Sequence, residues 1–316
     1  YDPNGVGVTG AGIFGLPFSP EESDLVIVPV PWEVTVSYMS GAARGPEAIL
    51  IASPQLDLFL PEAPNGWKMG VSMLEISQDI KQKSDFHRHK AWELITFLEE
   101  GGKIEESEDA RQIQADVNAA CSEMNVWVKS TTGEWLDQQK TVILLGGDHS
   151  TPLGFMQALA DRHAEFGILQ IDAHPDLRDA YEGFEFSHAS IMFNALKIPQ
   201  VSKLVQVGIR DFNGFEANLS ANSGGRVLTF YDRATSNRKF KGDNWDQICR
   251  DIVANLPMKV YISFDIDGLD PGLCPRTGTP VPGGLAFEEA LYLIEMVVES
   301  GRTIIGADLV EVAPGE

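Results

Sequence analysis

The chain has 316 residues, 43% of them hydrophobic and 22% charged, which are ordinary values for a globular protein with a large buried core. Wholesale disorder is therefore excluded. The formal net charge of −22 argues against a nucleic acid or an anionic membrane as partner, because both reward Lys and Arg. The same charge is compatible with a cationic substrate, although excess charge often serves only solubility.

Cysteine usage and hydropathy indicate the cellular compartment. Three cysteines, Cys121, Cys249 and Cys274, cannot form a disulfide framework in a chain of this length, and none belongs to a Cys-x-x-Cys pair. This usage favours a reducing, cytoplasmic location. No apolar run approaches the ~20 residues that a membrane-spanning helix needs.

Short apolar runs alternate with longer helical patterns along almost the whole chain. The runs are rich in Val and Ile and too continuously apolar for half-exposed strands, which is typical of a buried parallel sheet. Eight strands are predicted, at residues 24–30, 68–73, 141–145, 167–171, 204–209, 226–230, 260–264 and 303–309. This alternation predicts an α/β fold, a three-layer α/β/α sandwich with a central, mostly parallel eight-stranded sheet. We expect one domain over residues 1–316, with residues 1–23 as an N-terminal extension.

Unusual polar residues follow three of these strands. The segments are 144–150 (Leu-Leu-Gly-Gly-Asp-His-Ser), 171–176 (Ile-Asp-Ala-His-Pro-Asp) and 264–271 (Phe-Asp-Ile-Asp-Gly-Leu-Asp-Pro). In each, an apolar strand runs directly into carboxylates or imidazole. Parallel sheets place their ligand sites at the carboxyl ends of strands, so these residues are expected to form one site.

The spacing of these residues predicts a metal centre. Alternate residues of an extended chain point to one side, so Asp172 and Asp176 can converge with Asp265 and Asp267 from a neighbouring strand. Four buried carboxylates repel one another and lose hydration. Two divalent cations would balance their charge, with neutral His149 and His174 completing the ligands. Oxygen and nitrogen ligands without thiolate suit Mn, Ni, Fe or Co better than structural zinc.

Each piece taken alone has an ordinary structural explanation. A single Asp-x-Asp after a strand is usually a turn or helix cap, and a single buried His is usually a satisfied polar group of the core. The occurrence of all three patterns at successive strand ends is hard to reach by accident.

These motifs resemble the signature motifs of the ureohydrolases, the arginase/agmatinase family. The resemblance extends to residues 40–46, to 277–285 (Thr-Gly-Thr-Pro-Val-Pro-Gly-Gly-Leu) and to 308–311 (Asp-Leu-Val-Glu). It covers the chain from about residue 24 to the end and implies an arginase-like fold. Relatives usually continue into another helix after the last motif, so a C-terminal helix is expected to be missing here or replaced.

The resemblance also implies the metal ligands. One metal would be held by His149, Asp172, Asp176 and Asp265, and the other by Asp172, His174, Asp265 and Asp267, with Asp172 and Asp265 bridging. Nickel is the favoured metal and manganese the alternative.

The chemistry implied is hydrolysis of a guanidinium carbon with release of urea, for which a hydroxide bridging two metals is a strong nucleophile near neutral pH. Asp176 would orient the hydroxide and pass its proton to the departing nitrogen. Glu311 matches the carboxylate that pairs with the guanidinium group, and can form a bidentate pair. His188 matches a proton-shuttling histidine, and its alternative role is to cap the helix that follows.

The substrate is less constrained than the reaction. Arg178 stands where arginases commonly place an Asn, so arginine is not favoured, and Arg178 either faces a substrate carboxylate or pairs with Asp179. Formimidoylglutamases can show Asp-Leu-Arg here, but their first motif usually reads Gly-Gly-Gly-His-Glu. Agmatinases share Gly-Gly-Asp-His-Ser with this chain.

Bulky residues predict a small substrate. Segment 32–39 (Trp-Glu-Val-Thr-Val-Ser-Tyr-Met) and the connection 65–100 resemble the family branch that hydrolyses free guanidine and prefers nickel. A pocket crowded by such residues would select the tail-less cation by exclusion. The residues expected to crowd the pocket are Trp32, Tyr38, Met39, Tyr181 or Phe184. The residues expected to contact the substrate are Glu311, His188, Thr279, Trp32, Thr35 and Tyr38. The predicted reaction is guanidine plus water to urea plus ammonia, and the alternative is an agmatinase or another guanidino-compound ureohydrolase.

Other classes fit less well. A two-metal phosphatase would carry Gly-Asn-His-[Asp/Glu], a dinucleotide-binding protein would carry Gly-x-Gly-x-x-Gly after a strand, and neither motif is present. An inactive scaffold would have lost some ligands, and all six are here. The expected partners are a small cationic guanidino substrate and further copies of the chain, as a trimer or hexamer.

Overall fold

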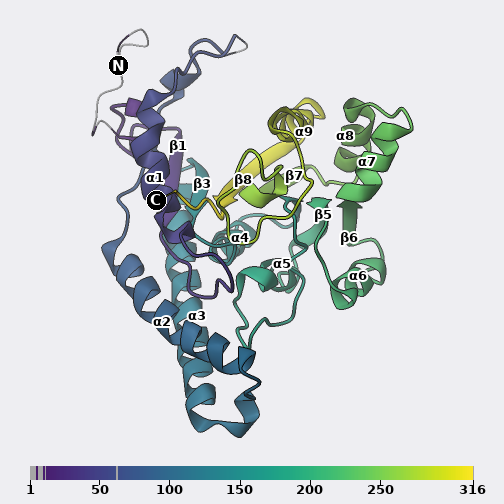
Figure 1. Ribbon diagram of the computed structural model, residues 1–316. Coiled ribbons are helices and arrows are strands. Elements are labelled where there is room, and N and C mark those ends of the chain that lie inside the picture. The colour runs from purple at the N-terminus through teal and green to yellow at the C-terminus, as the bar shows by residue number, and fades with distance from the viewer. Residues whose placement is uncertain (1–4, 6–9, 11, 62, 316) are drawn as a thin grey trace.

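The computed structural model describes residues 5, 10, 12–61 and 63–315, and its centre is one eight-stranded sheet (Figure 1). The strands run in the order β2-β1-β3-β8-β7-β4-β5-β6, and every pairing is parallel. Their bounds are β1 Leu25–Val30, β2 Val71–Met73, β3 Thr141–Gly146, β4 Phe166–Ile171, β5 Val201–Ile209, β6 Val227–Tyr231, β7 Lys259–Asp265 and β8 Thr303–Val310. All eight predicted strands are thus confirmed.

The second predicted strand is shorter than expected. Residues Gly66–Met69 form a 3₁₀ turn, and β2 begins only at Val71. Gly70 has φ +76°, a left-handed conformation that breaks the extended chain before the strand. The predicted N-terminal extension, 1–23, falls partly outside the described residues, and the division of the chain into one domain stays a prediction.

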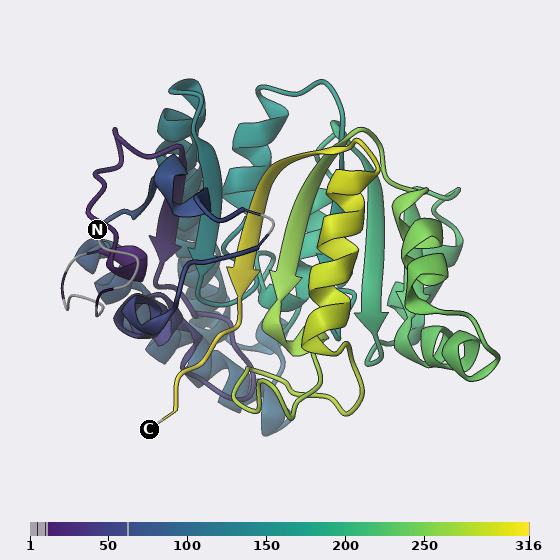
Figure 2. The same cartoon turned by 90° about the horizontal axis from the view of Figure 1, so that it is seen from above.

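Helices cover both faces of the sheet, which confirms the three-layer sandwich (Figure 2). Helices α2, α3, α4 and α5 pack on one face around the largest apolar core. Helices α8 and α9 pack on the other face, and α1 covers the same face near β1 and β3. The bounds are α1 Gly45–Ala52, α2 Gln78–Glu99, α3 Glu108–Asp137, α4 Leu153–Ala160, α5 Ile191–Ala195, α6 Gly214–Ala221, α7 Asp232–Phe240, α8 Trp245–Val253 and α9 Phe287–Glu299. Among the described residues, no helix combines the length and apolar composition that crossing a membrane requires.

Helices α2 and α3 form a long hairpin that extends past one end of the sheet (Figure 1). Ser77 and Ser107 cap their N-termini by accepting hydrogen bonds from Ile80 N and Ala110 N. Residues Glu108–Asp137 thus form the long outer helix α3. Its apolar stripe, which includes Val117 and Val128, is buried against the core.

The contact between α3 and α4 leaves no room for a side chain at Gly154. A Cβ there would clash with Asn125 O and lie 2.8 Å from Lys129 N, both backbone atoms of α3. Gly154→Ala should therefore destabilise the protein by about 1–3 kcal/mol through overpacking, although Ala is normally favoured over Gly by ~1 kcal/mol within a helix. Denaturant unfolding measures the change.

Gly133→Ala on α3 is the matched control. The nearest atom to its added Cβ is Arg162 Nη2 at 3.3 Å, a side-chain atom hydrogen-bonded to Gly133 O that needs to shift by only a few tenths of an ångström, whereas the atoms that a Cβ at Gly154 meets are backbone. Its free energy of unfolding should stay the same or rise. Equal destabilisation in both variants would contradict the close-contact explanation.

Candidate metal centre and active site

Four adjacent strands in the middle of the sheet supply the site. His149 follows β3, Asp172 to Asp176 follow β4, Asp265 ends β7 with Asp267 two positions later, and Glu311 follows β8. The order β3-β8-β7-β4 places these four carboxyl ends side by side. The topology thus brings together segments that are up to 162 residues apart.

The first ligand group is centred on His149. Its Nδ1 atom lies 3.0 Å from Asp172 Oδ2, 2.9 Å from Asp176 Oδ2 and 3.4 Å from Asp265 Oδ2. All four residues are buried. His149, Asp172 and Asp265 place their ligand atoms within 4.8 Å of one another, as a bound metal requires.

The second group is centred on His174, whose side chain is 21% exposed. Its Nδ1 atom lies 3.0 Å from Asp267 Oδ2 and 3.7 Å from Asp172 Oδ1. Asp172 therefore presents one oxygen to each group, as a bridging carboxylate would. Asp265 belongs by spacing to the first group alone.

Backbone N–H groups orient the carboxylates. Asp172 Oδ1 accepts from His174 N at 2.7 Å, Asp265 Oδ1 from Asp267 N at 2.9 Å, and Asp267 Oδ1 from Ala173 N at 2.9 Å. For Asp265 and Asp267, this leaves the second oxygen directed at an imidazole of the site.

Burial makes this arrangement costly without a cation. Burial and the neighbouring Asp172 charge raise the pKa of Asp176 to about 7, and the pKa of Asp265 lies well above its usual range for the same reasons and because of Asp267. No Lys or Arg among the described residues forms an ion pair with any of the six predicted ligands.

The donor set fits divalent cations. His149 Nδ1 is buried and has no hydrogen-bond partner, although three carboxylate oxygens surround it. A ring nitrogen and three carboxylate oxygens that converge in this way form a donor set that a divalent cation can bind, displacing any shared proton. The other ring nitrogen, Nε2, lies 2.9 Å from Ser263 Oγ, whose hydroxyl donates to Asp308 Oδ1 at 3.1 Å. This series of hydrogen bonds favours a proton on His149 Nε2 and leaves Nδ1 free to bind a metal.

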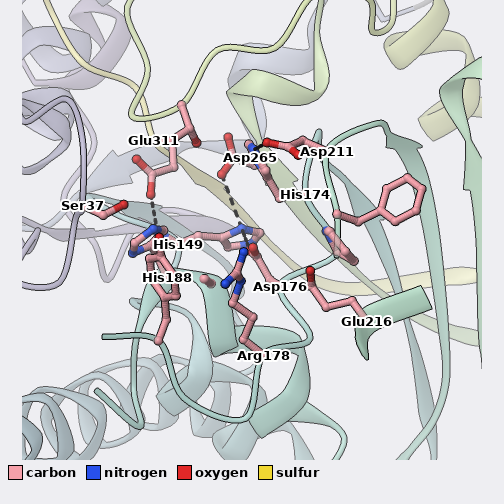
Figure 3. A pocket seen from close by; sticks show the side chains of 15 residues that line it. Ser37, His149, His174, Asp176, Arg178, His188, Asp211, Glu216, Asp265 and Glu311 are labelled. Atoms are coloured by element: carbon pink, nitrogen blue, oxygen red, sulfur yellow. Dashed lines mark hydrogen bonds and ion pairs between the residues drawn. The ribbon is translucent and has the colours of Figure 1, made fainter. Parts of the chain in front are cut away.

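A cavity of about 130 Å³ opens over the two groups. It is lined by three residues that were predicted to contact the substrate, Glu311, His188 and Thr279. It is also lined by four predicted metal ligands, His149, His174, Asp176 and Asp265 (Figure 3). Its outer wall is formed by Ser37, Arg178, Tyr181, Asp211, Phe212 and Glu216.

Most of the bulky residues expected to crowd the cavity lie elsewhere. Trp32 is 1% exposed and belongs to the core, Phe184 is fully buried, and Tyr38 is 70% exposed. None of these three lines the cavity, whereas Tyr181 does. Thr35 is also buried beneath the wall, where its Oγ1 accepts from His188 N at 3.3 Å.

Glu311 projects one free oxygen into the site. Its Oε1 accepts from His149 N at 2.9 Å, whereas its buried Oε2 has no partner. Burial and the nearby Asp148 charge raise the pKa of Glu311 well above its usual range. Glu311 has φ +61°, and its N–H donates to Gly147 O at 2.8 Å, so the surrounding structure holds a conformation that non-glycine residues avoid.

His188 begins a 3₁₀ turn and faces the cavity. Burial, followed by the charges of His174 and His149, lowers the pKa of His188 to about 3. Its ring is therefore neutral at physiological pH. The capping group of this turn is Ser187, whose Oγ accepts from Ala189 N.

Arg178 does not pair with Asp179. No ion pair of Arg178 is present among the described residues, and its guanidinium lies 4.4 Å from the centre of the Tyr181 ring. The cavity wall therefore carries a cation whose main contact is an aromatic face.

Some supporting residues escaped the sequence patterns. Ser263 was detectable only as a polar residue inside an apolar strand, and Asp308 only as part of the 308–311 motif, without a role. Arg210 gave no signal beyond a single cation after a strand, yet its Nη2 donates to Asp267 O at 2.6 Å and to Leu269 O at 3.1 Å. It also donates to Val281 O, so one side chain ties together two loops beside the site.

The sequence profile of the arginase family matches residues 23–315. The chain belongs to the arginase family. It is 32% identical over 303 residues to the N(1)-aminopropylagmatine ureohydrolase of Thermus thermophilus, covering 96% of this chain and 87% of the relative. It is 31% identical over 317 residues to the agmatinase of Neisseria meningitidis, covering 96% and 85%.

Solved structures share the fold. The agmatine ureohydrolase of Thermoplasma volcanium superposes with a TM-score of 0.69 at 22% identity, over 98% of this chain and 87% of that one. The arginase of Bacillus subtilis gives a TM-score of 0.65 at 21% identity, over 92% and 90%. This ureohydrolase is thus a metal-dependent hydrolase of amidine C–N bonds that acts on a guanidino compound.

The low pKa of His188 predicts a pH dependence of stability in this ureohydrolase. The unfolded chain takes up a proton on this histidine below pH ~6.5, whereas the folded chain does not until about pH 3. The stability of the unmodified protein relative to His188→Gln should therefore fall as the pH falls below ~6.5, by roughly 1–2 kcal/mol at pH 5.

Denaturant unfolding of both proteins at pH 5, 6 and 8 measures this difference. Taking the difference removes the contributions of groups common to both. A gap that stays constant from pH 8 to pH 5 would contradict a neutral His188.

Proposed function

We propose that two divalent metal ions bind here, one at His149, Asp172, Asp176 and Asp265 and the other at Asp172, His174 and Asp267, with Asp265 completing the second set. The shared Asp172 and the partnerless His149 Nδ1 support this assignment. Manganese and nickel both suit these oxygen and nitrogen donors. Such ions supply a nucleophile from water near neutral pH and polarise the group under attack.

The roles proposed for the chain's own residues follow from their positions. Asp176 lies among the proposed ligands and lines the cavity, where it can orient the attacking water and pass its proton to the departing nitrogen. His188 lies at the cavity wall, where we propose that it relays a proton. The free Oε2 of Glu311 is placed to accept from a guanidinium N–H.

We propose an agmatine-like compound, a guanidinium with a tail, as the substrate. The observation that carries this proposal is the position of Trp32 and Tyr38, which were expected to exclude a tail and do not line the cavity. Beyond the ligands, the wall continues along Tyr181 and Phe212 to the exposed Asp211. The relatives named above, an aminopropylagmatine ureohydrolase and an agmatinase, support the same choice.

Free guanidine, with nickel as the metal, is the second candidate. Arg178 lines the cavity without a carboxylate partner and would repel a second positive charge on a tail. A tail-less cation avoids that repulsion. The predicted homo-oligomer, trimer or hexamer, and the cytoplasmic location stay predictions.

Urea release decides between these substrates. Protein loaded with Mn²⁺ or Ni²⁺ should hydrolyse agmatine or N(1)-aminopropylagmatine with a higher kcat/KM than guanidine or arginine. Arg178→Gln should raise kcat/KM for agmatine more than for guanidine, because only agmatine has a second charge. If kcat/KM for guanidine is tenfold above that for agmatine, ~1.4 kcal/mol in transition-state free energy, the agmatine-like substrate is rejected. The proposed hydrolytic chemistry would still stand.

Glu311→Gln tests recognition of the guanidinium. The substitution keeps the shape and the bond from His149 N but can present a donor where the substrate needs an acceptor. We expect kcat/KM to fall by about 10- to 150-fold for every guanidino substrate, the ~1.5–3 kcal/mol of a hydrogen bond to a charged group. Metal content should not change.

The control is Glu185→Gln, the same substitution on an exposed side chain. It should leave kcat/KM unchanged. Loss of metal in Glu311→Gln would show that Glu311 supports the metal centre instead of the substrate.

A further inference from the structure

Buried polar side chains form a row across five strands beneath the metal ligands. The pairings Thr229–Gln206, Gln206–Gln170, Gln170–Ser263 and Ser263–Asp308 join β6, β5, β4, β7 and β8 at one level of the sheet. Gln170, Gln206 and Ser263 are fully buried. Burial of a side-chain amide is costly unless all its hydrogen bonds are made, so this row calls for a function.

Gln170 holds the metal-binding loop from below. Its Nε2 donates one hydrogen bond to Asp172 Oδ2 at 2.8 Å and a second to His174 O at 3.0 Å. Both protons of the amide are therefore used on two predicted metal ligands. The Asp172 carboxylate is held from one side by Gln170 and from the other by His174 N.

Gln206 fixes the orientation of Gln170. Its Nε2 donates to Gln170 Oε1 at 2.6 Å and to Pro175 O at 2.8 Å, so it also contacts the same loop directly. Thr229 Oγ1 donates to Gln206 Oε1 at 2.8 Å, and Ser220 Oγ lies 3.0 Å from Thr229 Oγ1. The hydrogen bonds then run in one direction, from Ser220 to Asp172, and reversing any amide would break at least two of them.

We propose that Gln170 and Gln206 are positioning residues that orient Asp172 and the 174–175 backbone for metal binding. Asp172 presents oxygens to both ligand groups, so a rotation of this one carboxylate would weaken both metal sites. Polar groups that orient metal ligands contribute to affinity although they never touch the metal. The inference concerns metal affinity and does not depend on which guanidino compound is hydrolysed.

Gln170→Met removes both donors and keeps the length of the side chain. Titration of the metal-free protein with Mn²⁺ in competition with a chelator should show roughly 10- to 100-fold weaker binding, the range for lost partners of metal ligands. No substrate is present in this measurement. At saturating Mn²⁺, kcat should fall while KM for the substrate stays unchanged, because neither glutamine lines the cavity.

Gln78→Met is the matched control, because Gln78 is exposed at the start of α2. Its amide donates to Ile76 O and not to a residue of the polar row. Its Mn²⁺ affinity should equal that of the unmodified protein. If Gln170→Met binds Mn²⁺ with an affinity within about twofold of this control, the proposal is overturned, even if the variant is less stable to unfolding.

Two further variants test the chain of hydrogen bonds, and the first also covers the case in which Gln170→Met does not fold. Thr229→Val is isosteric and removes the donor to Gln206 together with the contact to Ser220 Oγ, so it should weaken Mn²⁺ binding in the same direction but less. In the double variant Gln170→Met/Gln206→Met, the loss should stay near that of Gln170→Met alone, because Gln206 acts largely through Gln170. Unchanged affinity in Thr229→Val, or fully additive losses, would contradict the chain of hydrogen bonds.

Discussion

Mutual repulsion among buried carboxylates is the constraint on which this molecule depends. Four aspartates and two histidines meet at the centre of the sheet, and no Lys or Arg among the described residues is paired with them. Protons or bound cations must balance this charge at low dielectric, and the raised pKa values of Asp176 and Asp265 reflect the same cost. The parallel strands, the backbone N–H groups of the strand-end loops and the polar row beneath them all hold these six side chains in one place.

The constraint extends to the backbone. Asp176 and Glu311 have positive φ values of 53° and 61°, which cost energy in non-glycine residues. Each is held by hydrogen bonds, Asp176 through its carbonyl to Met192 N and Phe193 N, and Glu311 through its N–H to Gly147 O. Strain of this kind places each carboxylate where a regular strand could not, so we infer that it serves the site.

The α2–α3 hairpin connects the outer layer to the cavity wall. From α2, Arg88 donates to Val34 O and Ser40 Oγ, and Ser84 Oγ accepts from Glu33 N. From α3, Gln114 donates to Gly183 O at 2.7 Å, next to the loop that carries Tyr181. The hairpin thus contacts two of the segments that form the outer wall, and its sequence affects the shape of the cavity without contributing a ligand.

The sequence by itself determined the sheet and the place where the predicted metal ligands converge. Strand periodicity and the rule that ligands gather at carboxyl strand ends are local signals, and they were sufficient to predict all eight strands and the convergence of His149 with Asp172 and Asp265. Only the tertiary structure decided what surrounds that centre. Trp32 and Tyr38 were expected in the cavity wall because they are bulky and near in sequence, yet Trp32 packs into the core and Tyr38 is exposed, which only the path of the folded loop decides. The pairing of Gln170 with Gln206 likewise depends on strand register, which joins residues 36 positions apart and leaves no trace in a local pattern.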